Sequence, residues 1–194
     1  PLVAEDPKID KFYHNTINKG NFLATSDQKA YRYADVIIVD INLDVEKNNN
    51  KSGALIGFNV DLSNLKKAIT TIGENCKQDV LILVETTVPP GTCQDIVVPI
   101  IKDCLKKRNL RFNQIKIGHS YERVMPGPGY VDSIQSFYRV YSGIDEKDAD
   151  AVESFLHTII RTDEYPLTRL GSTNATEMAK VLENSYRAMN IAFV

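Results

Sequence analysis

The sequence lacks the features that nucleic-acid and membrane partners require. Its 23 lysines and arginines are outnumbered by 25 acidic residues, and no basic block occurs that would neutralise phosphates in series. The longest apolar runs, such as Val36–Val39 and Val80–Val84, are about a quarter of the ~20 residues that a membrane-spanning helix needs. The N-terminus has no basic stretch followed by an apolar core, as a signal peptide would. We therefore expect no nucleic-acid partner and no membrane span.

Cysteine is also scarce. Cys76, Cys93 and Cys104 are odd in number and lack the spacing of metal ligands. No histidine or basic residue lies near Cys93 in the sequence to lower the pKa of its thiol, and the other two cysteines fall in helical patterns. We expect three free thiols with packing roles, a reducing compartment such as the cytoplasm, and no metal site.

The chain has enough apolar residues for a substantial core. A length of 194 residues with 43% hydrophobic content fits one large domain, or one domain and part of another. Short apolar or β-branched segments between polar or turn residues predict strands at 35–40, 79–86, 114–119 and 137–142. The first two are apolar almost throughout, which is typical of parallel strands covered on both faces.

Helical patterns lie between the predicted strands. Apolar side chains recur at helical spacing over 62–72, 96–105 and 149–160. Alternating strands and helices predict the α/β class with a mainly parallel sheet. The polar segment Asn48–Gly53 predicts a loop between the first strand and its helix.

Its first residue and its last segment lead us to expect that the chain is part of a longer protein. Ser172, Thr173 and Asn174 are candidate caps for a helix that continues to Val194 without a glycine or proline stop signal. The chain does not begin with methionine. We expect one domain at 1–170, and at 171–194 the start of a long central helix.

Three polar clusters follow predicted strands, at 40–42, 86–91 and 119–127. Ligands of parallel α/β sheets bind beyond the carboxyl ends of the strands. The three clusters are therefore candidates for one cleft.

The cluster E-T-T-V-P-P-G-T-C, residues 85–93, predicts a stiff turn between a strand and a helix. Its two prolines fix the backbone, and Gly91 allows close approach. Thr87 would then hold its hydroxyl at the strand tip, ready to bond a cofactor or a water molecule. The alternative is that Thr86 or Thr87 only satisfies backbone groups and that Thr92 caps the following helix.

The cluster after the third strand contains Glu122, Arg123 and two Pro-Gly pairs, which keep backbone amides free for ligand oxygens. The alternative is that Glu122 and Arg123 form a solvated ion pair with each other. We interpret His119 as a satisfied histidine at a strand end and not as a catalytic group.

Polar residues on the terminal helix form one stripe, at Glu177, Lys180, Asn184 and Arg187. Lys180 and Asn184, one turn apart, can both point into a site. The alternative is that this stripe is only the wet face of the helix.

Three motifs in this order resemble the UDP-glucose/GDP-mannose dehydrogenase family, the NAD-dependent enzymes that oxidise the C6 alcohol of a nucleotide sugar to a carboxylate. They are V-E-T-T-V-P-P-G-T, H-S-Y-E-R-V-M-P-G and E-M-A-K-V-L-E-N-S-Y-R-A-M-N-I-A. The segment Gly20–Asp27 is also similar to the family's strand and turn G-x-x-x-A-T-x-D. The E-R-V-M-P-G form looks most like the branch acting on UDP-N-acetylhexosamines such as UDP-N-acetylmannosamine.

The resemblance implies a Rossmann-like domain, incomplete at its N-terminus, with NAD as cofactor. It implies that Val39 and Asp40 lie at a cofactor-contacting strand end, where D-I-N replaces the usual x-T-P. It further implies that Thr87 contacts NAD and places a catalytic water, and that Glu122 lies near the nicotinamide.

On the sugar side, the resemblance implies that Lys180 and Asn184 stabilise a developing oxyanion, a role that suits an ammonium and an amide donor in a dry site. Backbone contacts to the UDP-sugar would come from Arg123, Val124, Met125 and Pro126. The family's long helix implies a homodimer, and its setting is surface polysaccharide synthesis.

Several family features are absent from the sequence. It contains no G-x-G-x-x-G, no acidic residue placed to bind the ribose after a second strand, and no cysteine in the nucleophile's glycine-rich context. These features and the UDP-binding domain would lie outside the chain, so we expect the isolated 194 residues to show no turnover. Two other classes stay open, a non-catalytic nucleotide-binding or assembly module and a related hydroxy-acid dehydrogenase.

Overall fold

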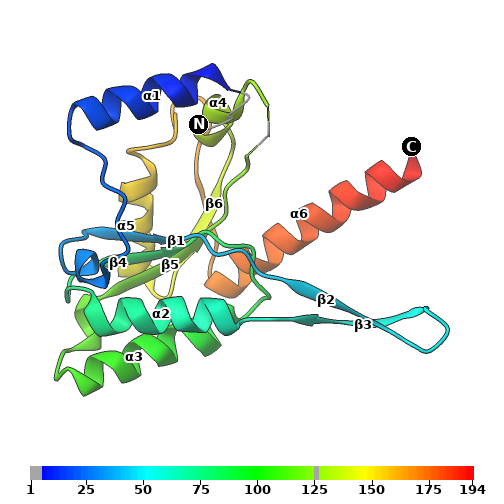
Figure 1. The fold of residues 1–194 in the computed structure, drawn as a ribbon, viewed down its shortest axis with the longest axis horizontal. Coiled ribbons are helices and arrows are strands. Elements are labelled where there is room, and N and C mark those ends of the chain that lie inside the picture. The colour runs from blue at the N-terminus through cyan, green and yellow to red at the C-terminus, as the bar shows by residue number, and fades with distance from the viewer. Residues whose placement is uncertain (1–5, 125–126) are drawn as a thin grey trace.

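The computed structural model describes residues 6–124 and 127–194. In chain order the helices and strands are α1 (Pro7–Asn18), η1 (Gln28–Arg32), β1 (Val36–Val39), β2 (Val45–Asn49), β3 (Leu55–Val60), α2 (Ser63–Asn75), β4 (Leu81–Val84), η2 (Cys93–Val97), α3 (Val98–Lys107), η3 (Phe112–Gln114), β5 (Lys116–Ser120), α4 (Tyr130–Gln135), β6 (Val140–Gly143), α5 (Glu146–Leu156), β7 (Thr168–Arg169) and α6 (Thr173–Phe193). Figure 1 shows a sheet between two helical layers, with α6 and the β2–β3 hairpin projecting from the body.

The central sheet has the order β1-β4-β5-β6-β7. Strands β1, β4 and β5 run parallel, β6 runs antiparallel to β5, and β7 runs parallel to β6. The predicted mainly parallel α/β sheet is confirmed, and β1, β4, β5 and β6 correspond to the four predicted strands.

Strand β4 lies at the centre of the core because both of its faces are covered. Ile82 and Val84 belong to the cluster that packs against α2 and α3, whereas Leu81 and Leu83 belong to the cluster that packs against α5. All four side chains are buried, which explains the continuous apolar run in the sequence.

The predicted helices are present with shifted bounds. The first becomes α2 and the third becomes α5, while the middle one begins as the π-helical turn η2 before continuing as α3. Helix α1 was not predicted, although Asp6 caps it and Pro7 is its first residue. No helix among the described residues is long and apolar enough to cross a membrane.

The expected loop at Asn48–Gly53 is confirmed for residues 50–53, which form a turn, and is wrong for its first two residues. Asn48 and Asn49 belong to β2, which pairs with β3 as an antiparallel hairpin. The turn forms because the Asn50 side chain accepts hydrogen bonds from the backbone N–H groups of Ser52 and Ala54. Both strands are largely exposed, so they lack the apolar alternation that would have revealed them.

The expected strand within Gly20–Asp27 is also wrong, because residues 21–27 pair with no strand of the described chain and are all exposed. The turn that follows is present. Asp27 caps η1 by accepting a hydrogen bond from the Lys29 amide, and Thr25 accepts one from the Asp27 amide.

The terminal helix α6 begins where predicted. Ser172 is its N-cap and accepts a hydrogen bond from the Ala175 amide. Its first turns are buried against β5, β6 and η2, whereas the second half extends away from the body (Figure 1). The helix therefore delivers only its first turns to the strand ends.

Candidate functional site

A pocket of about 590 Å³ lies at the carboxyl ends of β1 and β4. Its lining comes from the β1 end, the β4 end, the base of the hairpin, Glu122 and one residue of α6. The lining residues are Asp40, Ile41, Asn42, Leu43, Val45, Val60, Glu85, Thr86, Thr87, Val88, Pro89, Pro90, Glu122 and Val181. Parallel sheets bind ligands at this edge, and the volume is that of a ligand site.

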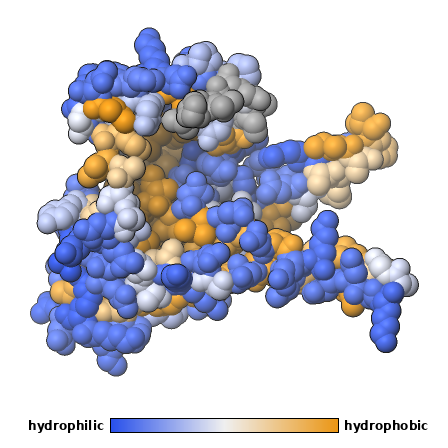
Figure 2. Space-filling model, in the orientation of Figure 1, coloured by the Kyte–Doolittle hydropathy of each residue, from blue (hydrophilic) through white to orange (hydrophobic). Residues whose placement is uncertain are grey.

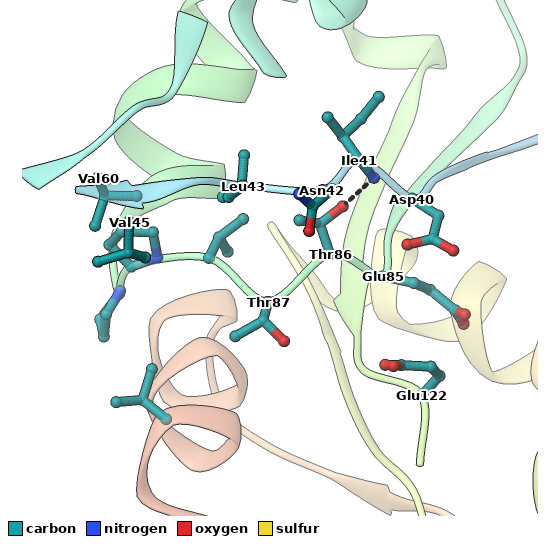
Figure 3. Close-up of a pocket in the computed structure, with 14 residues that line it drawn as sticks. Asp40, Ile41, Asn42, Leu43, Val45, Val60, Glu85, Thr86, Thr87 and Glu122 are labelled. Carbon is teal, nitrogen blue, oxygen red and sulfur yellow. Dashed lines mark hydrogen bonds between the residues drawn. The ribbon is translucent and has the colours of Figure 1, made fainter. Parts of the chain in front are cut away.

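The two threonines of E-T-T-V-P-P-G-T-C have different roles. Thr86 is buried, and its hydroxyl donates to the Val39 carbonyl at 3.2 Å and accepts from the Ile41 amide at 2.7 Å, so it joins the ends of β1 and β4. Thr87 is exposed in the pocket and has no hydrogen-bond partner among the described residues. In Figure 3 its hydroxyl is directed into the pocket. The backbone-satisfying alternative therefore holds for Thr86 and leaves the Thr87 hydroxyl available to a ligand.

The turn after Thr87 is held by a residue from α6. The Glu177 carboxylate is fully buried and accepts the backbone N–H groups of Gly91 at 2.6 Å and Cys93 at 2.8 Å. Thr92 makes no cap hydrogen bond, because its hydroxyl donates to the Pro89 carbonyl. Glu177 thus caps this helix from a distant segment, and the sequence offered no signal for that role beyond its place in the polar stripe.

The pocket wall is acidic. Asp40, Glu85 and Glu122 all line it, and Figure 3 shows their carboxylates on one side of the pocket. Burial raises the pKa of Glu85, an effect opposed by the Arg139 guanidinium 2.9 Å away and reinforced by the charges of Glu122 and Asp40. Sequence reasoning missed both Glu85 and Arg139 because they lie 54 positions apart in the chain.

Lys180 lies beside this wall. Its ammonium donates to the Glu122 carbonyl at 2.9 Å, lies 3.9 Å from the Glu122 carboxylate, and stacks over the Tyr121 ring at 4.8 Å. The side chain is only 8% exposed, and burial lowers the pKa of the amine. The wet-face alternative therefore fails for Lys180, which occupies a desolvated position next to a pocket residue.

The remaining predicted site residues lie around this centre. Asn184 is half-buried one turn after Lys180, and its side chain has no hydrogen-bond partner among the described residues. Arg123 pairs with Glu183 at 3.4 Å and lies over the Phe137 ring, so the solvated Glu122–Arg123 pair is wrong. Val124 is half-buried and is not among the pocket-lining residues. Met125 and Pro126 lie outside the described residues.

Val39 is in the core and does not line the pocket. Its carbonyl is already bonded by the amides of Glu85 and Thr86 and by the Thr86 hydroxyl. The Val39 side chain is therefore not placed to contact a cofactor in the pocket. The neighbouring residue Asp40 is exposed there.

His119, in β5, is fully buried. The Thr176 hydroxyl donates to the Thr173 carbonyl and lies 2.8 Å from Nδ1 of His119. The Thr176 hydroxyl also lies 2.9 Å from the Ser142 hydroxyl, and Nε2 of His119 has no hydrogen-bond partner among the described residues. The prediction of a satisfied histidine thus holds for one ring nitrogen only.

We expect His119 to make stability depend on pH. Burial lowers its pKa to about 4 from 6.5, so the unfolded chain takes up this proton first as the pH falls. Its contribution is present above pH 6.5 and is lost towards pH 4, by ~3 kcal/mol at most. Urea unfolding of wild type and His119→Gln across this range should show the wild type losing more stability. An imidazole that titrates near pH 6.5 in NMR spectra would contradict the expectation.

The three cysteines are free and buried, as predicted. Burial is the main cause that raises the pKa of each thiol, and for Cys93 the nearby Glu177 carboxylate raises it further. Among the described residues no group of three or more histidine, cysteine or acidic side chains is placed to hold a metal ion.

Residues 2–160 match the family model described as UDP-glucose/GDP-mannose dehydrogenase family, NAD binding domain. The chain belongs to this family. The resemblance carried by the three motifs is confirmed, and the acidic pocket at the strand ends is a site on the family's NAD-binding domain.

Known relatives of this NAD-binding domain include a UDP-N-acetyl-D-mannosamine dehydrogenase of Methanocaldococcus jannaschii, 33% identical over 178 residues, which are 91% of this chain and 36% of that protein. A UDP-N-acetyl-D-glucosamine 6-dehydrogenase of Pseudomonas aeruginosa is 34% identical over 135 residues, 69% of this chain and 30% of that protein. The solved UDP-D-ManNAc dehydrogenase from Pyrococcus horikoshii superposes with a TM-score of 0.76 at 25% identity, covering 97% of this chain and 41% of that one. The chain spans less than half the length of these relatives.

Proposed function

We propose that this chain is the NAD-binding portion of a nucleotide-sugar 6-dehydrogenase that oxidises the C6 alcohol of a UDP-N-acetylhexosamine to a carboxylate. The observation that carries the proposal is the meeting of Thr87, Glu122 and Lys180 at the strand ends, from three segments that the family motifs mark. The names of the relatives, UDP-N-acetyl-D-mannosamine and UDP-N-acetyl-D-glucosamine dehydrogenases, support the substrate class.

The residues present fit the nicotinamide end of NAD. Three carboxylates in the wall would repel a diphosphate, whereas they suit a cationic ring and ribose hydroxyls. The apolar side chains of Val88, Val181 and the hairpin base offer contact area for a flat ring. NAD, when bound, supplies a hydride acceptor. In this proposal Asp40 and Glu122 face the cofactor, and the Thr87 hydroxyl orients a water molecule.

On the sugar side, the desolvated Lys180 ammonium supplies positive charge where an alkoxide or tetrahedral oxygen develops. Asn184 adds an amide donor one turn along α6. Backbone groups of the segment from Arg123 to Pro126 hold the UDP-sugar. The Asn184 side chain has no hydrogen-bond partner in the described chain, so its amide is available to a ligand.

Substrate specificity tests this function. We expect the complete polypeptide that carries this chain to form NADH from UDP-N-acetylmannosamine or UDP-N-acetylglucosamine at least tenfold faster than from UDP-glucose, GDP-mannose or a 3-hydroxy acid. Absorbance of NADH under identical conditions measures the rates. A preference for the 3-hydroxy acid would favour the hydroxy-acid dehydrogenase, and no NADH from any substrate would favour the non-catalytic module.

We also propose that residues 1–170 form the NAD-binding domain and that 171–194 begin a central helix through which two copies associate in the cytoplasm. Figure 2 shows apolar residues along the projecting end of α6. The exposed apolar residues there are Met178, Leu182, Tyr186, Met189, Ile191, Phe193 and Val194. Met178, Leu182, Tyr186, Met189 and Phe193 recur at helical spacing on one face, and an exposed apolar face of this kind marks an interaction surface.

Replacing Leu182 by glutamate is expected to convert the dimer of the complete polypeptide into a monomer, because the new carboxylate would be buried without a partner in the interface. Sedimentation velocity measures the change. Lys67→Glu, on the exposed face of α2, should leave the dimer intact. A Leu182→Glu protein that remains dimeric would contradict the proposed interface.

A further inference from the structure

The strongest unused feature of the pocket is Glu85, at the end of β4. One of its carboxylate oxygens accepts a hydrogen bond from Arg139 at 2.9 Å, and the other has no hydrogen-bond partner among the described residues. The Glu85 side chain is 15% exposed and Arg139 is 4% exposed. Glu85 lines the pocket and Arg139 does not, so the carboxylate lies between the pocket and the guanidinium.

The charge along the wall is unbalanced on the side that faces the pocket. Asp40 and Glu122 line it together with Glu85, whereas no lysine or arginine of the described chain does. The Lys180 ammonium, 3.9 Å from the Glu122 carboxylate, offsets part of the Glu122 charge. Asp40 is exposed to water, so its charge is screened more strongly than that of Glu85. Of the three carboxylates, Glu85 is the least exposed to water, so solvent screens its charge least, while Arg139 at 2.9 Å offsets part of it.

We propose that Glu85 makes the pocket prefer oxidised over reduced nicotinamide, an inference that rests on the proposed function. The oxidised ring carries a positive charge, and this charge disappears when the ring gains a hydride. A desolvated carboxylate beside the ring attracts the first form and gains nothing from the second. The expected consequence is that reduced cofactor leaves readily after each hydride transfer, which limits product inhibition.

Other wall groups do not explain the same preference as well. Glu122 also has a cation nearby but is 40% exposed, compared with 15% for Glu85, and a charge that water screens discriminates more weakly between ring states. Arg139 would act in the opposite direction, but the Glu85 carboxylate lies nearer the pocket.

Binding measurements without turnover test the inference. Dissociation constants of NAD⁺ and NADH are measured by titration calorimetry for the complete polypeptide that carries this chain. In Glu85→Gln we expect the preference for NAD⁺, taken as the ratio of the NADH and NAD⁺ dissociation constants, to fall about tenfold, equivalent to ~1.4 kcal/mol. The loss should come from weaker NAD⁺ binding, with NADH binding changed less than twofold.

Two control variants test whether the change in cofactor preference is specific to Glu85. Asp40→Asn removes a carboxylate from the same wall at an exposed position and should change the ratio about twofold or less. Glu74→Gln removes the same charge from the exposed face of α2 and should leave the ratio unchanged. If Glu85→Gln fails to fold because Arg139 is left unpaired, the double variant Glu85→Gln with Arg139→Met removes both charges. Its ratio should still lie below that of the wild type.

The outcomes separate the two proposals. Equal weakening of NAD⁺ and NADH in the Glu85 variants, or no change in either, would overturn the redox preference while leaving the dehydrogenase function in place. A wild-type protein that binds neither cofactor form would overturn the proposed function and this inference with it.

Discussion

Replacing Glu177 by alanine is expected to lower the free energy of unfolding by about 3–5 kcal/mol. The carboxylate is fully buried and accepts the backbone N–H groups of Gly91 and Cys93 at the start of η2. Its removal would leave both donors buried without acceptors and would open a cavity between α6 and the turn. Urea unfolding of the complete polypeptide that carries this chain measures the loss.

Glutamine at the same position should cost less, about 1–2 kcal/mol, because its carbonyl still accepts one of the two hydrogen bonds. Burial raises the pKa of Glu177, so ionisation inside the protein is disfavoured, and a neutral replacement recovers part of that cost. Glu74→Ala, on the exposed face of α2, is the control and should change stability by less than ~0.5 kcal/mol. A Glu177→Ala protein as stable as this control would show that the turn does not depend on its cap.

Replacing Lys180 by methionine is expected to lower kcat of the complete enzyme by about 10²–10³, the usual effect of removing one donor to a developing oxyanion. Methionine is unbranched and only one atom shorter than lysine, so it fills most of the same space while the ammonium, with its contacts to the Tyr121 ring and Glu122, is lost. Steady-state NADH formation with a UDP-N-acetylhexosamine gives kcat and KM.

The comparison of kcat with NAD⁺ binding distinguishes a catalytic role of Lys180 from a role in cofactor binding. NAD⁺ binding should change by less than threefold, since Lys180 is not among the residues that line the pocket. Lys107→Met removes an exposed ammonium paired with Asp103 on α3 and should leave kcat within twofold of wild type. An unchanged kcat in the Lys180→Met enzyme would contradict a catalytic role for Lys180.

How much of the fold could be predicted depended on burial. Strand β4 is covered on both faces, so its apolar run was visible in the sequence, and α2 presents a buried stripe at helical spacing. The β2–β3 hairpin is held by backbone pairing and an asparagine turn, and its exposed strands are under no requirement to be apolar. Local patterning therefore missed it.

The candidate site could be predicted in part, for a related reason. Thr87 and Lys180 lie in dense local motifs, whereas the Glu85–Arg139 pair and the Glu177 cap join residues 54 and more positions apart. Sequence spacing carries no information about such contacts until the sheet order brings the segments together. The structure also separates the two threonines: Thr86 ties β1 to β4, whereas the Thr87 hydroxyl has no partner among the described residues.

The stoichiometry of oxidation tests the central claim most directly. Oxidation of an alcohol to a carboxylate requires two hydride transfers. We predict that the complete polypeptide that carries this chain forms two molecules of NADH for each UDP-N-acetylhexosamine consumed, and that mass spectrometry identifies the product as the uronic acid. One NADH per sugar, with an aldehyde or ketone as the product, or no consumption of the sugar, would contradict the account.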